Sequence, residues 1–374
     1  MTESWCLLFC VLPLYIFCRR IQKNDSKWWD NIIYGFCFGV IAFIRINNGI
    51  IPASIILVLF IKTLRERQVG VAFRQIGLQL LGLLLAVAPM IIYFGSKGAL
   101  YDMIYANYIF NMEYMAKWTA IAGDQDIFTM IYGKLRWLFP VIILFFWSLR
   151  QVIKKKKGND IDLMLTVASG ITILANIKSM SYLHYYITFL PLIMMLAIKT
   201  AKIFNKNILN ANIFSKTMIS LSVLWFVVVF VPTVFGWALQ IGKDIYKFGL
   251  IHGAGTNPEI ENVTGMIERN VPAKQMNDIY NVGTYDGVAT LLRLDALPAG
   301  KYFFLQGKLS KVSDKVANEI DNYTRDESPA FILTDKESLN TDNPSLKRMF
   351  ERYEVVDSAN HSTYLMKLSH NLHD

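Results

Sequence analysis

The stretch WWDNIIYGFCFGVIAFI, residues 28–44, decides the fold. It holds a single charged residue, Asp30, near its start. A helix needs about 20 mostly apolar residues to cross about 30 Å of hydrocarbon, so this stretch is typical of a membrane span. Similar stretches lie on both sides of it, at residues 4–18, 50–61, 74–95, 135–152, 161–177, 183–199 and 217–241. Together they predict a polytopic α-helical membrane protein with about eight spans.

Basic residues follow every second stretch. The clusters are Arg19, Arg20, Lys23 and Lys27; Arg65, Arg67 and Arg74; the lysines at 154–157; and Lys199, Lys202, Lys206 and Lys216. Lys and Arg close to a span end resist translocation and stay in the cytoplasm. We therefore expect the loops at 45–49, 96–134 and 178–182, and everything beyond residue 241, to lie outside the cell.

Charge divides the chain into two predicted parts. Residues 1–242, the transmembrane domain with an external amphipathic loop at 96–134, hold 23 Lys/Arg and 10 Asp/Glu and carry +13. Residues 243–374, a soluble extracytoplasmic domain, hold 15 and 19 and carry −4. The positive excess is spread over cytoplasmic loops, so it does not indicate a nucleic-acid partner. All four cysteines, Cys6, Cys10, Cys18 and Cys37, precede the soluble part, which therefore has no thiol for a disulfide.

The soluble part has the pattern of a small α/β domain, because short apolar runs alternate with polar helical stretches. We expect helices at 258–270, 285–294, 310–325 and 345–353, strands at 278–282, 302–305 and 330–334, and a hairpin of 354–356 with 363–367. Asn257 is the expected cap of the first helix, with Pro258 in its first position. About 130 residues suffice for one modest core.

The first residues fit no secretory signal, because Glu3 precedes the first stretch and the cations follow it. The charge pattern places Met1 outside. We expect that an odd number of upstream spans is missing, as in a fragment or a misassigned start. The alternative is a short translocated tail.

Several segments carry a resemblance to a known family. They are IRINNG at 44–49, YFGSKGALYDMIYANYIFNMEYM at 93–115, YLHYYITFLPLIMMLA at 182–197, DIYNVGTYDGVATLLRLDALPAGKYFF at 278–304 and PAFILTD at 329–335. Over about residues 30–370 the chain resembles bacterial polyprenyl-phosphate-sugar-dependent glycosyltransferases of the GT-C fold. These are similar to protein mannosyltransferases and the lipid A aminoarabinose transferase.

The resemblance implies a GT-C-like helical bundle in the plasma membrane of a bacterium. It implies transfer of a sugar from a polyprenyl-phosphate carrier to a glycan, lipid or protein acceptor, with inversion in most members. Family members keep an Asp, or an Asp/Glu pair, in the first extracytoplasmic loop, and this chain lacks that region. Its own activity is therefore left open. The alternative is a non-enzymatic membrane protein with an extracytoplasmic binding or sensing domain.

Sugar transfer needs a carboxylate to accept a proton and cations to hold the departing phosphate. Asp102, directly after a span, is a weak candidate for the catalytic base, against a solvated loop carboxylate. Arg45, with Asn47 and Asn48, is a candidate for binding the lipid phosphate, because a cation at a span end on the outer side is unusual. The alternative for Arg45 is snorkelling to lipid headgroups.

Two further groups are candidates for substrate binding. His184 and Tyr185 start a span on the outer side, where an interfacial aromatic belt or a structural role is the alternative. In GT-C enzymes, helices of the external loop flank the active-site cavity. Asn111 and Tyr114 are candidates to line it, against plain loop packing. His361, His370 and His373 have no spacing typical of metal ligands, so neither a divalent metal nor another cofactor is implied.

Overall fold

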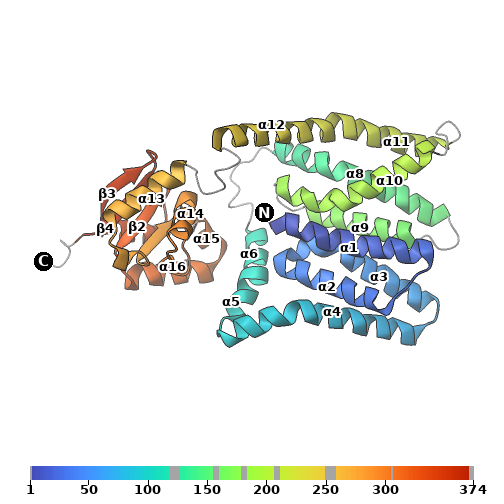
Figure 1. The fold of residues 1–374 in the computed structure, drawn as a ribbon, viewed down its shortest axis with the longest axis horizontal. Coiled ribbons are helices and arrows are strands. Elements are labelled where there is room, and N and C mark those ends of the chain that lie inside the picture. Colours follow the sequence, from blue (N-terminus) through green and yellow to red (C-terminus); the bar gives the residue numbers. More distant parts are fainter. Residues whose placement is uncertain are drawn as a thin grey trace. The chain divides into compact units, whose positions relative to one another are not determined.

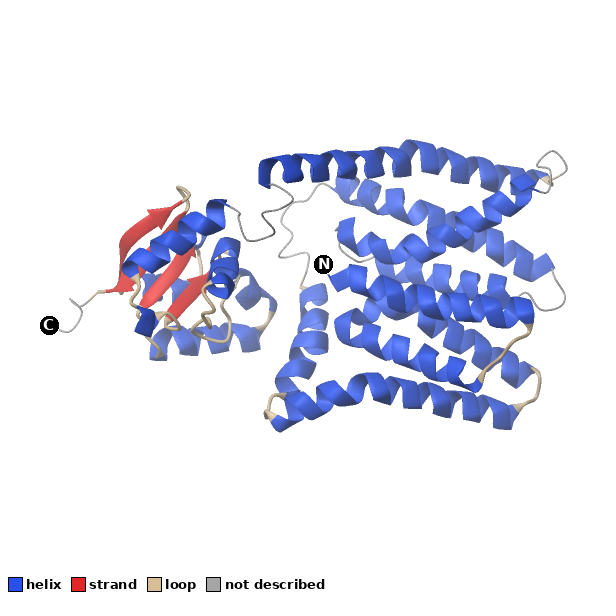
Figure 2. Cartoon of the chain, in the orientation of Figure 1, coloured by secondary structure: helices blue, strands red, loops and turns tan. Residues whose placement is uncertain are grey.

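The computed structural model describes residues 2–117, 127–154, 160–177, 183–205, 211–248, 258–304 and 306–369. The chain divides into two compact units. One is Met1–Asn111 with Asp124–Phe235, and the other is Met112–Gly123 with Gly236–Asp374. In the described residues, the first unit is helical and the second contains a small mixed sheet, as Figure 1 and Figure 2 show.

A helix covers each of the apolar stretches. The long helices are α1 (Thr2–Lys23), α2 (Trp28–Arg45), α3 (Ile50–Arg65), α4 (Val69–Ser96), α8 (Ile127–Lys154), α9 (Asp160–Ile177), α10 (Leu190–Asn205), α11 (Ile213–Trp225) and α12 (Val231–Phe248). The π-helical turn η5 (Phe226–Phe230) joins α11 to α12 without a break. Among the described residues, six helical segments are long and apolar enough to cross a membrane, which supports a multi-pass protein. Eight crossings remain a prediction.

One of those six segments, Trp28–Arg65, contains two helices. Helix α2 ends at Arg45, where the backbone is extended, with φ −170° and ψ 107°. The 3-10 turn η1 (Ile46–Gly49) follows. Gln79 of α4 donates to Asn31 at the start of α2 at 3.4 Å. One turn earlier on α4, Gln75 accepts from Thr63 at the end of α3 at 3.2 Å. The start of α2 and the end of α3 therefore meet the same part of α4, so α3 runs back along α2 (Figure 1).

Helices α2 and α4 approach each other through glycines. An added Cβ on Gly35 would lie 1.8 Å from the Gln79 carbonyl oxygen, and one on Gly82 would lie 2.0 Å from the Ile32 carbonyl oxygen. An added Cβ on Gly39, one turn beyond Gly35, would lie 2.8 Å from the Cβ of Ala86. Gly35 and Gly39 form a GxxxG motif, which lets helix backbones pack closely where lipid offers no hydrophobic drive for association.

Ion pairs join the helices at the opposite end from η1. Asp30, fully buried, accepts from Arg19 at 2.8 Å and from the backbone N–H of Lys27 at 3.0 Å. Lys62 lies 2.6 Å from Asp160 at the start of α9, and Lys199 pairs with Asp162, two residues on. We call this end, with Arg19, Lys62 and Lys199, the basic end. Because each pair joins two helices, the acidic residues at the first turns of α2 and α9 hold the bundle together there.

Residues 100–116 of the loop after α4 are helical. This segment contains α5 (Leu100–Ile104), the π-helical turn η2 (Tyr105–Ile109) and α6 (Phe110–Ala116) in succession. The Tyr108 hydroxyl donates to the Ala42 carbonyl at 3.1 Å, so this helix packs on the end of α2. Helix α8 begins at Ile127, earlier than the predicted span at 135.

The second unit contains a four-stranded sheet of order β1-β2-β4-β3. Strands β1 (Ile279–Val282) and β2 (Phe331–Asp335) are parallel, whereas β3 (Tyr353–Ala359) and β4 (Thr363–Leu368) form an antiparallel hairpin whose β4 pairs with β2. Residues 360–362 connect the two strands, and the Ser362 N–H donates to the Ala359 carbonyl at 3.3 Å across Asn360 and His361, which both have positive φ. The predicted strands at 278–282 and 330–334 and the hairpin are confirmed.

Helices lie on both faces of this sheet. They are α13 (Pro258–Asn270), α14 (Tyr285–Arg293), α15 (Gln306–Val312), α16 (Asp314–Asp326), α17 (Lys336–Leu339) and α18 (Pro344–Phe350). Residues of α13 and α14, including Met266 and Leu291, bury one face with Ile279 and Phe331. On the other face, Tyr280 packs on Tyr323 of α16, with ring centroids 4.7 Å apart. Neighbouring residues of a strand point to opposite faces, so β1 is buried on both sides.

Two predictions for this domain are wrong. The described residues of 302–305 form no strand, because side chains take their carbonyl groups: Gln306 donates to the Tyr302 carbonyl at 2.8 Å and Asn281 to that of Phe303 at 2.8 Å. The single helix expected at 310–325 is two helices, α15 and α16, because Ser313 caps a new helix. The expected cap Asn257 lies outside the described residues.

Candidate functional site

Several predicted site residues gather where α2 ends. We call this the Arg45 end: Arg45, the turn η1, the helical segment of α5 and η2, and η3 (Leu183–Phe189) at the start of α10. Arg45 is half-buried and begins the extended turn that reverses the chain. Asn47, two residues on, is exposed. The turn therefore places one cation and one amide at the surface of this end.

Asn48 points the other way, into the bundle. Its side chain is 8% exposed and its Nδ2 donates to the Cys6 sulfur at 3.5 Å. The Cys10 thiol donates to the Asn48 carbonyl, also at 3.5 Å. Asn48 therefore ties η1 to the first half of α1, and both of its described contacts are with that helix.

The candidates on the external helix differ in exposure. Asp102 is exposed in the first turn of α5. Asn111 is also exposed, but its amide donates to the Asn107 carbonyl of its own helix at 2.8 Å. Tyr114 is half-buried on α6. Of these three, Asp102 offers a carboxylate at the surface, as a proton acceptor would require.

His184 and Tyr185 lie in the 3-10 helix η3, and their side chains are outside the described part of the structure. The neighbouring Tyr186 is 4% exposed, and its ring stacks on Trp137 of α8 with centroids 5.9 Å apart and planes at 15°. Trp225 of α11 meets the edge of Trp137 at 6.2 Å. An aromatic cluster therefore joins η3, α8 and α11.

Arg136 belongs to the same cluster and was missed from sequence. Its guanidinium donates to the Thr233 hydroxyl of α12 and lies 5.9 Å from the centre of the Trp137 ring. Its carbonyl accepts from the Trp225 indole at 2.7 Å. The signal was present, because a cation within an apolar helix is costly and often functional. We overlooked it because Arg136 stands at the edge of the apolar stretch, whereas the helix itself starts at Ile127.

The Arg45 turn and the Arg136 cluster lie at the same end of the bundle. Asn48 fixes η1 to the first half of α1, and η3 also packs on α1. Tyr186 of η3 then links to α8 through Trp137. This end therefore combines two guanidinium groups with flat aromatic rings, a combination suited to an anion carrying an apolar or ring-shaped substituent.

In the described parts of the chain, no three His, Cys, Asp or Glu side chains converge as metal ligands would. His361 lies on the β3–β4 turn, and His370 and His373 lie outside the described residues. Comparison of the chain with known protein families, curated proteins and solved structures finds no match. Conclusions about function therefore depend on the residues and their geometry.

Proposed function

We propose that the chain is a membrane glycosyltransferase of the GT-C type, which moves a sugar from a polyprenyl-phosphate carrier to an acceptor outside the cell. The Arg45 end and the α/β domain then face the same extracytoplasmic compartment of a bacterial plasma membrane. The observation that carries the proposal is the gathering of Arg45, Arg136 and a buried aromatic cluster at one end of an apolar helical bundle.

In this proposal the two arginines serve the lipid phosphate. A phosphate near the edge of the hydrocarbon attracts a cation more strongly than in bulk water, because the local dielectric is lower. Guanidinium groups match phosphate oxygens in pairs, which favours Arg over Lys for this task. Arg45, half-buried at the turn, is the residue that would contact the phosphate directly.

The reaction itself needs a proton acceptor. An acceptor hydroxyl attacks the anomeric carbon, the bond from that carbon to the phosphate oxygen breaks, and a carboxylate takes the hydroxyl proton. Within this chain Asp102 is the candidate for that carboxylate, since it is exposed at the start of the external helix. The resemblance to GT-C enzymes places the catalytic Asp elsewhere, in the first extracytoplasmic loop.

The test measures binding of polyprenyl phosphate to the full chain in lipid nanodiscs. We expect Arg45→Ala to weaken binding about tenfold, because a charge-assisted contact to the phosphate is lost. The matched control is Arg65→Ala, in the last turn of α3 at the basic end. Equal binding by wild type and Arg45→Ala would remove Arg45 from the site, and failure of the wild type to bind would refute the lipid donor.

Sidedness is tested separately. Leu297 is 72% exposed in the α/β domain, while Cys6, Cys10 and Cys37 are buried in the membrane unit. A Leu297→Cys variant in intact cells is expected to react with a membrane-impermeant maleimide, with the wild type as control. Labelling only after the cells are opened would place the domain in the cytoplasm and exclude the proposed function.

A second candidate is a membrane protein that presents a binding domain and performs no chemistry. The observation that favours it is a polar pocket at the carboxyl ends of β1 and β2, where open α/β sheets bind ligands. Under this alternative, polyprenyl phosphate would not bind at the Arg45 end, whereas a ligand would still bind the α/β domain.

A further inference from the structure

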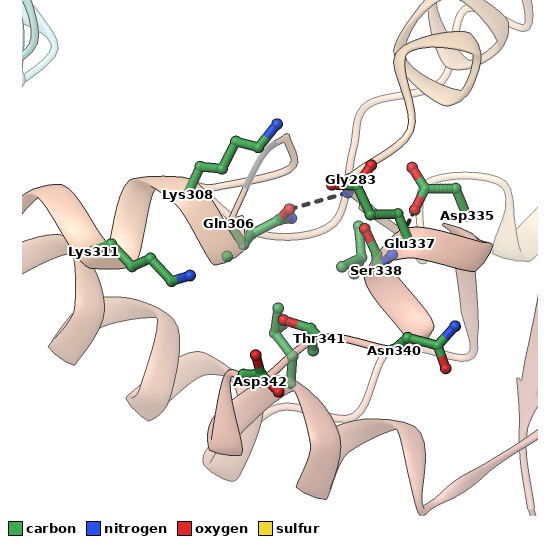
Figure 3. Close-up of a pocket in the computed structure, with 13 residues that line it drawn as sticks. Gly283, Gln306, Lys308, Lys311, Asp335, Glu337, Ser338, Asn340, Thr341 and Asp342 are labelled. Carbon is green, nitrogen blue, oxygen red and sulfur yellow. Dashed lines mark hydrogen bonds between the residues drawn. The ribbon is translucent and has the colours of Figure 1, made fainter. Parts of the chain in front are cut away.

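The pocket in the α/β domain has a volume of about 330 Å³. It lies where the parallel strands β1 and β2 end, between the N-terminal half of α15 and the loop that contains α17 (Figure 3). Sites for small ligands have volumes of this size or larger, and in open α/β sheets they lie at this edge. Its position and size therefore both fit a ligand of the size of a monosaccharide phosphate.

The floor of the pocket is fixed by hydrogen bonds. Gln306 is fully buried, and its side chain accepts from the Gly283 N–H at 3.2 Å and donates to the Asn281 carbonyl at 2.7 Å. Gly283 has φ +82°, and a Cβ there would lie 1.8 Å from the Ser338 hydroxyl. Glycine is thus required both by the backbone conformation and by the close approach of the α17 loop. The two walls are held at a set separation.

One wall is positively charged. Lys308 and Lys311 stand one turn apart on α15, and both line the pocket. In Figure 3, Lys311 extends into the space between the walls. Among the described residues, neither lysine forms an ion pair or a side-chain hydrogen bond, in contrast to Lys315, which lies 3.7 Å from Glu319. Two lysines with no described carboxylate partner favour an anion such as phosphate.

The opposite wall offers acceptors for hydroxyl groups. Asp335, at the end of β2, uses Oδ1 to accept from the Ser338 N–H at 2.7 Å, and its Oδ2 lies on the Gly283 side. Asn340, Thr341 and Asp342 continue this wall. Carboxylates and amides accept from the hydroxyls of a sugar. The acidic wall also disfavours a bare anion, and the lysines disfavour a bare cation.

We propose that this pocket binds a sugar phosphate, either free or as the headgroup of a lipid. Lys308 and Lys311 hold the phosphate, and Asp335, Asn340 and Asp342 hold hydroxyls of the sugar ring. The inference rests on a binding role for the α/β domain. It does not depend on sugar transfer at the Arg45 end.

The probe is glucose 1-phosphate, titrated calorimetrically into the full chain in detergent, with glucose and inorganic phosphate titrated in parallel. We expect glucose 1-phosphate to bind with a Kd of about 1 mM or tighter, and each half alone to bind at least about tenfold more weakly. The Lys308→Gln/Lys311→Gln variant is expected to weaken binding about tenfold, and Asp342→Asn about threefold. Lys347→Gln changes an exposed lysine that does not line the pocket, so it serves as the matched control.

Three results would overturn the proposal. They are no binding by the wild type, equal binding of inorganic phosphate and glucose 1-phosphate, or unchanged binding by the double lysine variant. An unaltered thermal unfolding curve shows that each variant is folded. A second titration uses a polyprenyl-phosphate-linked glucose in nanodiscs: tighter binding than glucose 1-phosphate assigns the lipid headgroup, and weaker binding assigns the free compound.

The Arg45→Ala variant separates this site from the proposed function. It is expected to bind glucose 1-phosphate as the wild type does, even where it loses polyprenyl phosphate. Loss of glucose 1-phosphate binding in Arg45→Ala would place the sugar phosphate at the Arg45 end and refute the pocket.

Discussion

The helical unit and the α/β domain hold their elements together by different means. In the helical unit, α2 and α4 meet where side chains are missing, at Gly35, Gly39 and Gly82. In the α/β domain, large apolar side chains such as Phe331 and Met266 fill the space between sheet and helices. Apolar side chains gain little by leaving lipid for a protein interior, whereas leaving water yields about 25 cal/mol per Å². The difference indicates that the α/β domain is sensitive to lost volume and the α2–α4 contact to added volume.

The largest expected effect tests the α/β half of this comparison. Phe331→Ala removes a ring that is 1% exposed and leaves a cavity between β2 and α13. We expect the free energy of unfolding of this domain to fall by about 4 kcal/mol. The measurement is chemical denaturation of the full chain, followed by a fluorophore attached to a Leu297→Cys background. A loss below about 1 kcal/mol would show that this core is loosely packed.

The second prediction tests the α2–α4 contact with an added side chain. Gly35→Val places carbon atoms against the Gln79 carbonyl, so the helices must separate. We expect the free energy of unfolding of the membrane unit to fall by about 3 kcal/mol. The readout is the thermal unfolding midpoint of the membrane unit in detergent. Gly77→Ala is the matched control, because nothing lies within 4 Å of its added Cβ, and it is expected to be neutral or slightly stabilising. Equal midpoints for both variants would contradict the close approach.

The third prediction concerns the ion pairs of the basic end. Asp30→Asn keeps the size of a fully buried side chain but removes the nearer of the two carboxylates beside Arg19. We expect the free energy of unfolding of the membrane unit to fall by about 2 kcal/mol. This is less than the loss expected for a fully buried ion pair, because the Arg19 side chain is 20% exposed. Asp25→Asn is the control: Asp25 is 3.8 Å from the same arginine but 44% exposed, and little change is expected. The same thermal assay measures both.

The smallest expected effect is a pH dependence of the α/β domain. Asp357 accepts from the Ser358 N–H at 2.8 Å and from the Asn270 side chain at 2.7 Å, which hold its pKa below the usual 3.8. The unfolded chain therefore takes up a proton more readily than the folded one. Stability from this group is present above pH 4 and is lost as pH falls below that value. We expect this group to make the free energy of unfolding about 0.5 kcal/mol larger at pH 6 than at pH 3. This difference should be absent in Asp357→Asn, and chemical denaturation at the two pH values measures it.

Local signals made the α/β domain largely predictable from sequence. Helix α13 begins at Pro258 and ends at Asn270, as expected, and Thr284 caps α14 by accepting from Gly287. The failure at 302–305 has a partly nonlocal cause, because the Phe303 carbonyl accepts from Asn281, which is 22 residues earlier in the chain. The alternation of apolar and polar residues, from which strands are predicted, does not show such a contact.

The helices of the membrane unit were predictable from sequence, and the contacts between them were not. An apolar stretch identifies a span, but residues on every side of it are apolar, so the face that meets a neighbour is not marked. The GxxxG motif of α2 is the feature of the sequence that marks its contact with α4. Of the predicted site residues, Arg45 and Asn47 lie at the surface of the turn and Asn48 packs inward, whereas Arg136 was not predicted.

The π-helical turn η5 sets how the helix from α11 to α12 contacts α8. Trp225, before the turn, and Thr233, after it, both hydrogen-bond to Arg136. In an uninterrupted α-helix these two positions would be about 80° apart around the axis, since each residue advances by about 100°. The additional residue of the wide turn reduces the offset to about 20°. Deleting one residue from Phe226–Phe230 would leave a regular α-helix in which the two positions are seven residues apart and again about 20° apart, so the wide turn lets this span carry one extra amino acid while both contacts with Arg136 are kept.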